Sequence, residues 1–206
     1  IESDMQALGK FKADTIPLMK RTIYVLAECD SITIEKLMES VGVKSKATMY
    51  DIIDAFITAE LLIKVPAYGT HLAAVKNPAR YLFMSPSIRA GIFNVVGIPA
   101  TELTRRGLLL EDYAALHYYR EFVKNGSGSL THPYKKEGGK ADFILRLENR
   151  KQIAIEFGLG KKGFSQVQET MTSENCDYGL VFSESELEIS SDEKSVSVPL
   201  DYFFLM

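Results

Sequence analysis

The feature that most constrains this chain is the stretch ADFILRLENRKQIAIEFGLG at 141–160. It holds two apolar runs, at 143–145 and 153–155, separated by the polar residues ENRK at 148–151. This spacing of apolar run, polar turn and apolar run predicts a β-hairpin. The second run is apolar almost throughout, which predicts a strand buried in the middle of a sheet.

Two carboxylates lie on this hairpin. Asp142 opens the first predicted strand and Glu156 closes the second. In an antiparallel pair the start of one strand lies beside the end of the next, so we expect the two acids to be neighbours. Neighbouring carboxylates repel unless a cation lies between them, and magnesium is a cation that prefers oxygen ligands. The sequence therefore predicts a magnesium site at Asp142 and Glu156, and if a metal binds there we expect the main-chain carbonyl of Phe157 as a third ligand.

The hairpin resembles the core of the restriction-endonuclease-like superfamily, the PD-(D/E)XK nucleases. In that superfamily an acid is followed along the chain by Glu-x-Lys on a buried strand. The resemblance implies magnesium-dependent cleavage of DNA, as an endonuclease or exonuclease, with the lysine holding the attacking water and the phosphate. This chain departs from the pattern, because it reads Glu156-Phe157-Gly158 and has glycine at the lysine position.

A positive group is expected where Gly158 leaves a gap, and Lys161 and Lys162 in the following loop are the first candidates. Lys140, just before the hairpin, is another. Two functions stay open. One is an active hydrolase with a displaced lysine, and the other is a non-catalytic module that keeps the nuclease fold as a scaffold.

The elements around the hairpin complete an α/β domain. Apolar spacing predicts a helix that follows 104–107, strands at 130–134 and 178–183, a helix at 163–171 and a last strand at 196–200. With the hairpin this is the αβββαβ order of the superfamily. The resemblance implies that Glu111, on the first helix, points at the metal. The alternative is an ordinary surface carboxylate in a first helical turn, where the helix dipole favours it.

The earlier part of the chain predicts a winged helix-turn-helix. A first helix begins near Asp14, a second is capped by Ser31 and stopped by Gly42, and a third begins at 44–46. Two strands follow, at 61–65 and around 71–75.

We expect the third helix to enter a DNA major groove and the wing to touch phosphates. The predicted DNA contacts are Lys44, Lys46, Tyr50, Lys64, His71 and Lys76. Asp51 and Asp54 on the same helix would repel phosphate, so a protein-interaction or spacer module is the alternative.

Three further motifs, YLFM at 81–84, SPSIR at 85–89 and RGLLLE at 106–111, follow in order. Together with the predicted domains they resemble the C-terminal region of a bacterial and archaeal family of AAA-type ATPases. The resemblance covers 14–206 and implies a winged helix at 14–84, a connector at 85–99 and a restriction-endonuclease-like domain at 100–206. No GxxxxGK[ST] phosphate loop occurs in the chain, so ATPase activity would lie in a module outside it. Docking such an ATPase onto DNA or a protein is the non-catalytic alternative.

Composition narrows the classes of function and the cellular settings that remain. A net charge of -3 argues against an indiscriminate polyanion binder but is compatible with a local basic surface. No apolar run approaches the roughly 20 residues that span a bilayer, and the polar first residues do not resemble a signal peptide. Cys29 and Cys176 share no metal-binding or redox spacing, so we expect reduced thiols in a cytoplasmic protein. The absence of an initiator Met suggests a piece of a longer chain.

Overall fold

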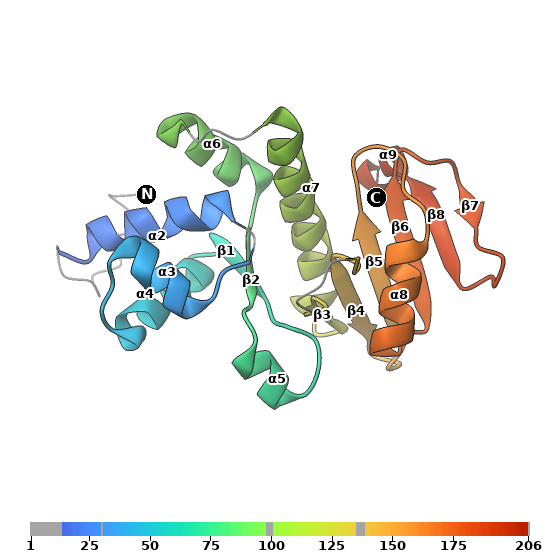
Figure 1. Cartoon of the computed structure of the whole chain (residues 1–206), viewed down its shortest axis with the longest axis horizontal. Coiled ribbons are helices and arrows are strands. Elements are labelled where there is room, and N and C mark those ends of the chain that lie inside the picture. The colour runs from blue at the N-terminus through green and yellow to red at the C-terminus, as the bar shows by residue number, and fades with distance from the viewer. Residues whose placement is uncertain (1–13, 30, 98–100, 135–138, 206) are drawn as a thin grey trace.

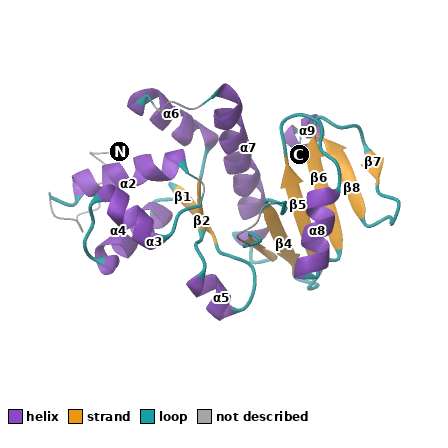
Figure 2. Ribbon diagram, viewed as in Figure 1, coloured by secondary structure: helices purple, strands orange, loops and turns teal. Residues whose placement is uncertain are grey.

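The computed structural model describes residues 14–29, 31–97, 101–134 and 139–205. The expectations placed on the first 13 residues lie outside this part of the chain. The predicted mixed α/β class is confirmed (Figures 1 and 2). A mainly helical first part lies on one side of a long central helix, and a sheet with helices on both faces lies on the other (Figure 2).

The first part contains the three predicted helices and an antiparallel strand pair. The elements are α2 (Ile16–Glu28), α3 (Ile34–Val41), α4 (Lys46–Thr58), β1 (Leu62–Val65) and β2 (Arg80–Phe83). Local chemistry sets their ends. The Thr33 hydroxyl accepts the main-chain N–H of Lys36 at the start of α3, so Thr33 is the cap rather than the expected Ser31. Gly42 ends the same helix at φ 86°, a conformation that favours glycine.

The expected strand around 71–75 is wrong. These residues form the short helix α5 (His71–Lys76), because the Thr70 hydroxyl caps it by accepting the main-chain N–H of Ala73. The strand that pairs with β1 is β2, with Lys64 opposite Tyr81. The predicted wing is therefore replaced by a longer segment that carries a helix.

The expected connector at 85–99 contains the helix α6 (Pro86–Val96), and its buried Ile92 and Phe93 pack into the core of the first part. The central helix is α7 (Glu102–Tyr118), which continues as a π-helical turn, η1 (Tyr119–Val123). The remaining elements are β3 (Gly128–Thr131), β4 (Phe143–Leu147), β5 (Gln152–Phe157), α8 (Ser165–Glu174), β6 (Tyr178–Ser183), β7 (Glu188–Ile189), β8 (Ser195–Pro199) and α9 (Leu200–Phe204). The predicted αβββαβ order is thus present from α7 to β6.

Within the described residues the strands of this part form one six-stranded mixed sheet in the order β3-β4-β5-β6-β8-β7. Strand β6 runs parallel to both β5 and β8, and the other pairs are antiparallel. Helix α8 covers one face of the sheet (Figure 1). Helices α7 and α9 pack on the other face, where Phe157, Phe182 and Phe203 are buried together.

Strands β1 and β2 join the two parts of the molecule. Leu62, Tyr81 and Phe83 face the core of the first part. Ile63, Val65 and Leu82 alternate with them along the strands and pack into the core formed by α7 and the sheet. The short sheet is consequently buried on both faces.

A buried ion pair reinforces this junction. Arg89 on α6 donates to both carboxylate oxygens of Asp112 on α7, at 2.6 and 2.9 Å, and both side chains are fully buried. Arg89 also donates to the carbonyl of Ala27 at the end of α2, and Asp112 accepts the main-chain N–H of Phe83.

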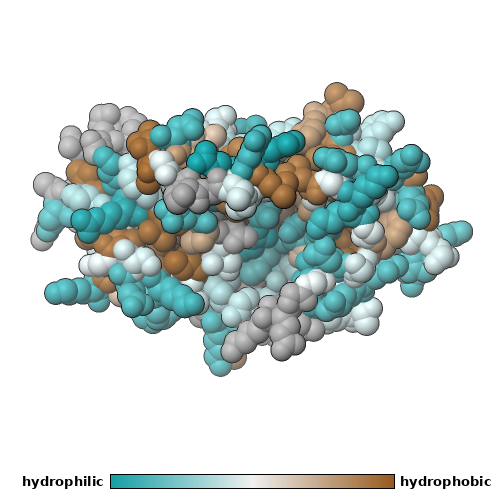
Figure 3. Space-filling model, turned by 45° about the horizontal axis from the view of Figure 1, so that its top comes forward, coloured by the Kyte–Doolittle hydropathy of each residue, from teal (hydrophilic) through white to brown (hydrophobic). Residues whose placement is uncertain are grey.

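None of the described helices has the length and apolar character needed to cross a membrane. Hydrophilic side chains cover most of the face seen in Figure 3, with hydrophobic side chains in smaller groups between them.

Candidate functional site

The two predicted acids converge. Strands β4 and β5 pair antiparallel with Phe143 opposite Ile155, so one further step along the register brings Asp142 opposite Glu156. Asp142 Oδ2 accepts the main-chain N–H of Phe157 at 2.8 Å, which fixes its carboxylate at the end of β5. Side chains alternate along a strand, so Glu156 shares the α8-covered face of the sheet with Ala154.

Lys162 crosses Gly158 and reaches Glu156. Its Nζ lies 2.8 Å from Oε1 of Glu156. A Cβ built on Gly158 would lie 2.8 Å from Cγ of Lys162 and closer still to its Cε. The lysine side chain therefore runs across the surface of Gly158, and only glycine leaves it this path.

Helix α8 holds the lysine in position. Gln166, in its first turn, accepts a hydrogen bond from Lys162 Nζ at 3.2 Å and donates one to the carbonyl of Lys140 at 3.1 Å. The amine of Lys140 itself bonds Ser173 and Glu174, away from the acids, and Lys161 is exposed. Of the three candidate lysines, the structure brings Lys162 to the acid pair.

Burial dominates the electrostatics of Glu156, whose side chain is 3% exposed. Its pKa is raised to about 7, because burial and, to a smaller extent, the negative charge of Asp142 outweigh the opposing effect of the Lys162 ammonium group. While Glu156 is ionised, its buried Oε2 has no hydrogen-bond donor among the described residues. When Glu156 is protonated, it can share its proton with Asp142, which also favours the neutral form.

The donor set fits a hard divalent cation. Two adjacent carboxylates, one of them with an unsatisfied buried oxygen, are what magnesium binds when waters and a substrate phosphate supply its other ligands. No group of three or more His, Cys, Asp and Glu side chains suited to a metal occurs in the described part of the chain. The main-chain N–H of Phe157 contacts Asp142, and the role of the Phe157 carbonyl as a metal ligand stays a prediction.

Glu111 on α7 contacts the site through an arginine that the sequence reasoning missed. Arg80, on β2, forms an ion pair with the Glu111 carboxylate and donates to the main-chain carbonyl of Asp142 at 3.2 Å. Its guanidinium also lies 5.3 Å from the ring centre of Phe143. An arginine at the start of the otherwise apolar strand RYLF was the signal in the sequence.

The six predicted DNA contacts divide into two groups. The first group lines a groove of about 390 Å³ between α3, α4, β1 and the α5 segment. Its members are Lys46, Tyr50, Lys64 and Lys76. Lys44 and His71 form the second group, which is exposed and lies outside the lining of the groove. Lys46 pairs with Glu35, which also lines the groove, at 2.5 Å.

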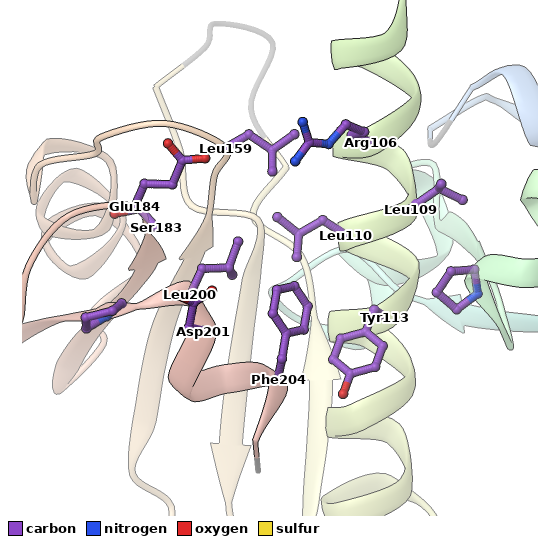
Figure 4. Close-up of a pocket in the computed structure, with 12 residues that line it drawn as sticks. Arg106, Leu109, Leu110, Tyr113, Leu159, Ser183, Glu184, Leu200, Asp201 and Phe204 are labelled. Atoms are coloured by element: carbon purple, nitrogen blue, oxygen red, sulfur yellow. The ribbon is translucent and has the colours of Figure 1, made fainter.

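A separate, largely apolar pocket of about 530 Å³ lies where α7 faces α9 (Figure 4). Leu110 and Tyr113 on α7 point toward Phe204 on α9, with Arg106 and Glu184 at opposite sides (Figure 4). Its lining includes neither acid of the pair, so it is distinct from the acid–lysine cluster.

No family model matches this chain. Over 208 aligned residues it is 27% identical to MJ1637, an uncharacterized protein of Methanocaldococcus jannaschii. The alignment covers all of this chain and 42% of that protein. The chain thus spans less than half the length of the relative that it matches.

Proposed function

We propose that this chain is a nucleic-acid-processing module in which Asp142, Glu156 and Lys162 form a magnesium-dependent site for hydrolysis of DNA phosphodiester bonds. The observation that carries the proposal is the position of Lys162. Its amine contacts Glu156 from a loop, and its side chain crosses the glycine that replaces the motif lysine. The set of two acids and one amine is thereby complete in space although it is interrupted in sequence.

Each of the three groups has a distinct part in this chemistry. Asp142 and Glu156 would hold the metal, which lowers the pKa of a bound water and offsets charge that develops on the phosphate. Asp142 is oriented by the main-chain N–H of Phe157, and Lys162 by Gln166. The Lys162 amine donates hydrogen bonds and a positive charge where negative charge gathers on the phosphate oxygens.

A non-catalytic docking module is the second candidate, and one observation favours it. Lys162 already forms a direct ion pair with Glu156, which offsets part of the negative charge of the acid pair without a cation. In this case the fold serves to present the basic groove of the first part to DNA or to a partner.

Cleavage assays separate the two candidates. Supercoiled and linear DNA are incubated with the protein in magnesium or manganese, and the products are resolved on gels. The nuclease proposal expects Asp142→Asn and Lys162→Met each to lower the rate by about a hundredfold or more, because each removes a group that stabilises the transition state. Lys161→Met is the matched control, because Lys161 is the exposed neighbour of Lys162, and this variant should retain activity.

A Lys162→Met variant with full activity would contradict the proposed role of the lysine. If the wild-type protein does not cleave DNA but shifts its mobility, and Lys44→Glu with Lys46→Glu abolishes that shift, the docking module is correct. If it neither cleaves nor binds DNA, protein–protein contact is the remaining function.

The wider setting is also a proposal. In a longer protein, comparable to the relative of which the chain covers 42%, we expect an AAA-type ATPase module to drive this region on DNA. Cys29 and Cys176 form no disulfide, which fits the proposed reducing, cytoplasmic setting.

A further inference from the structure

The groove on the first part of the molecule has walls from three separate segments. The start of α3 and the N-terminal half of α4 form one wall, and Ala74 with residues 76–78, at the end of α5 and beyond it, form the other. Tyr81 on β2 lies at its buried base, and Lys64 is directly opposite Tyr81 on β1. The site is therefore concave, with a volume of about 390 Å³, and we call this groove the channel.

Positive groups converge on this channel from different elements. Lys46 comes from α4, Lys64 from β1 and Lys76 from α5, and all three are exposed. The first turn of α3 also lines the channel, and the N–H groups of a helix start favour an anion. These two features together point to a ligand with more than one negative charge.

The carboxylate of Glu35 is the opposing charge in the channel. It pairs with Lys46, but the two side chains are 65% and 59% exposed. An ion pair this exposed contributes little to stability, so an incoming phosphate can replace Glu35 as the partner of Lys46 at small cost.

Tyr50 adds a surface for a base. It lies on α4 one turn after Lys46, lines the channel and is 45% exposed. An exposed aromatic ring beside lysines is the usual means by which proteins hold single strands, because bases stack on the ring while phosphates contact the cations.

The channel does not suit a duplex. A recognition helix must enter a major groove about 12 Å wide, which requires a free helix face. On α4 the face that carries Lys46 and Tyr50 looks across the channel at Ala74 and residues 76–78. Lys44 and His71, which duplex docking would use, lie outside the lining.

We propose that this channel binds a single-stranded nucleic acid, with phosphates on Lys46, Lys64 and Lys76 and a base on Tyr50. The inference extends the proposed function by naming the substrate class, and it concerns a surface apart from the acid–lysine cluster. Ala79 and Tyr81 line the channel, whereas Arg80 between them contacts Glu111 and the carbonyl of Asp142. Strand β2 thus separates the two sites.

The test is binding of fluorescently labelled oligothymidylate, about ten nucleotides long, measured by anisotropy in EDTA so that no cleavage occurs. The wild-type protein should bind the single strand more tightly than a duplex of equal length. Lys64→Gln and Lys76→Gln should each weaken binding several-fold and reduce the slope of log K against log salt by about 0.7. Tyr50→Leu should weaken it about fivefold or more through lost stacking.

Two matched variants sharpen the result. Glu35→Gln removes the opposing charge and should tighten binding, an effect that damage to the fold cannot mimic. Lys36→Gln removes an exposed lysine of the same part of the molecule that does not line the channel, and it should leave binding unchanged.

Tighter binding of the duplex, or equal losses from Lys44→Gln and Lys64→Gln, would overturn the proposal in favour of recognition-helix docking. If inorganic phosphate displaces the oligothymidylate when both are at the same phosphate concentration, the site binds phosphate alone. This result would also overturn the proposal. Single-strand binding without cleavage of plasmid would leave this inference standing while the proposed hydrolase fails.

Discussion

The buried Glu156 should make the stability of this protein fall as the pH rises toward 8. Its pKa is raised from 4.5 to about 7 in the folded state, so between these values the folded protein holds a proton that the unfolded chain has released. Stability then decreases with increasing pH, because the unfolded state binds fewer protons. At about 1.4 kcal/mol for each pKa unit, the raised pKa of Glu156 corresponds to about 3 kcal/mol of unfolding free energy at most. The contribution is fully present below pH 4.5 and is lost as the pH passes through about 7.

Glu156→Gln tests this directly, because glutamine keeps the shape of the side chain and cannot ionise. In urea unfolding at pH 5 the variant and the wild type should differ by less than about 1 kcal/mol. At pH 8 the variant should be the more stable protein by up to about 3 kcal/mol, since it no longer buries a charge beside Asp142.

Glu148→Gln is the control, because Glu148 is an exposed carboxyl in the turn of the same hairpin. It should show the pH dependence of the wild type. If Glu156→Gln also keeps the full wild-type dependence, Glu156 is ionised throughout, and the argument from burial is wrong.

Three further predictions follow from the same contacts. Gly158→Ala should displace Lys162 and raise the pKa of Glu156 as much as Lys162→Met does. The variant with both substitutions should have the same Glu156 pKa as either single variant, measured by ¹³C NMR titration of the carboxyl group. Asp112→Ala should lower the free energy of unfolding by about 3–5 kcal/mol in urea, because it leaves the fully buried Arg89 without its carboxylate. Magnesium at about 100 times its dissociation constant should stabilise the wild-type protein at pH 8 by about 2.7 kcal/mol, and should not stabilise Glu156→Gln to that extent, in thermal unfolding.

The hairpin was predictable because its signals are local. The apolar runs, the polar turn and the antiparallel register follow from residues close together in the chain, so Asp142 and Glu156 were expected to be neighbours, and they are. Helix ends were predictable to within a few residues for the same reason. The prediction of a strand around 71–75 was wrong. The Thr70 hydroxyl caps a helix there, and this cap is also a local signal in the sequence.

The remaining parts of the site depended on long-range packing. Sequence alone left Lys161 and Lys162 as the first candidates and Lys140 as a further one, and only the path of the loop over Gly158 decides for Lys162. Arg80 had no expected role, because its partners, Glu111 and the carbonyl of Asp142, lie 31 and 62 positions away in the chain.

The sequence by itself determined the order of elements from α7 to β6, the acid pair and the lysines available to bind an anion. Periodicity, caps and turn residues act over a few positions, so each can be read without knowing the fold. The tertiary structure alone decided which lysine meets Glu156 and that Lys46, Lys64 and Lys76 line one channel. The first outcome depends on the path of the loop over Gly158. The second depends on how β1 and β2 pack between the two cores, and that packing buries apolar surface from distant parts of the chain.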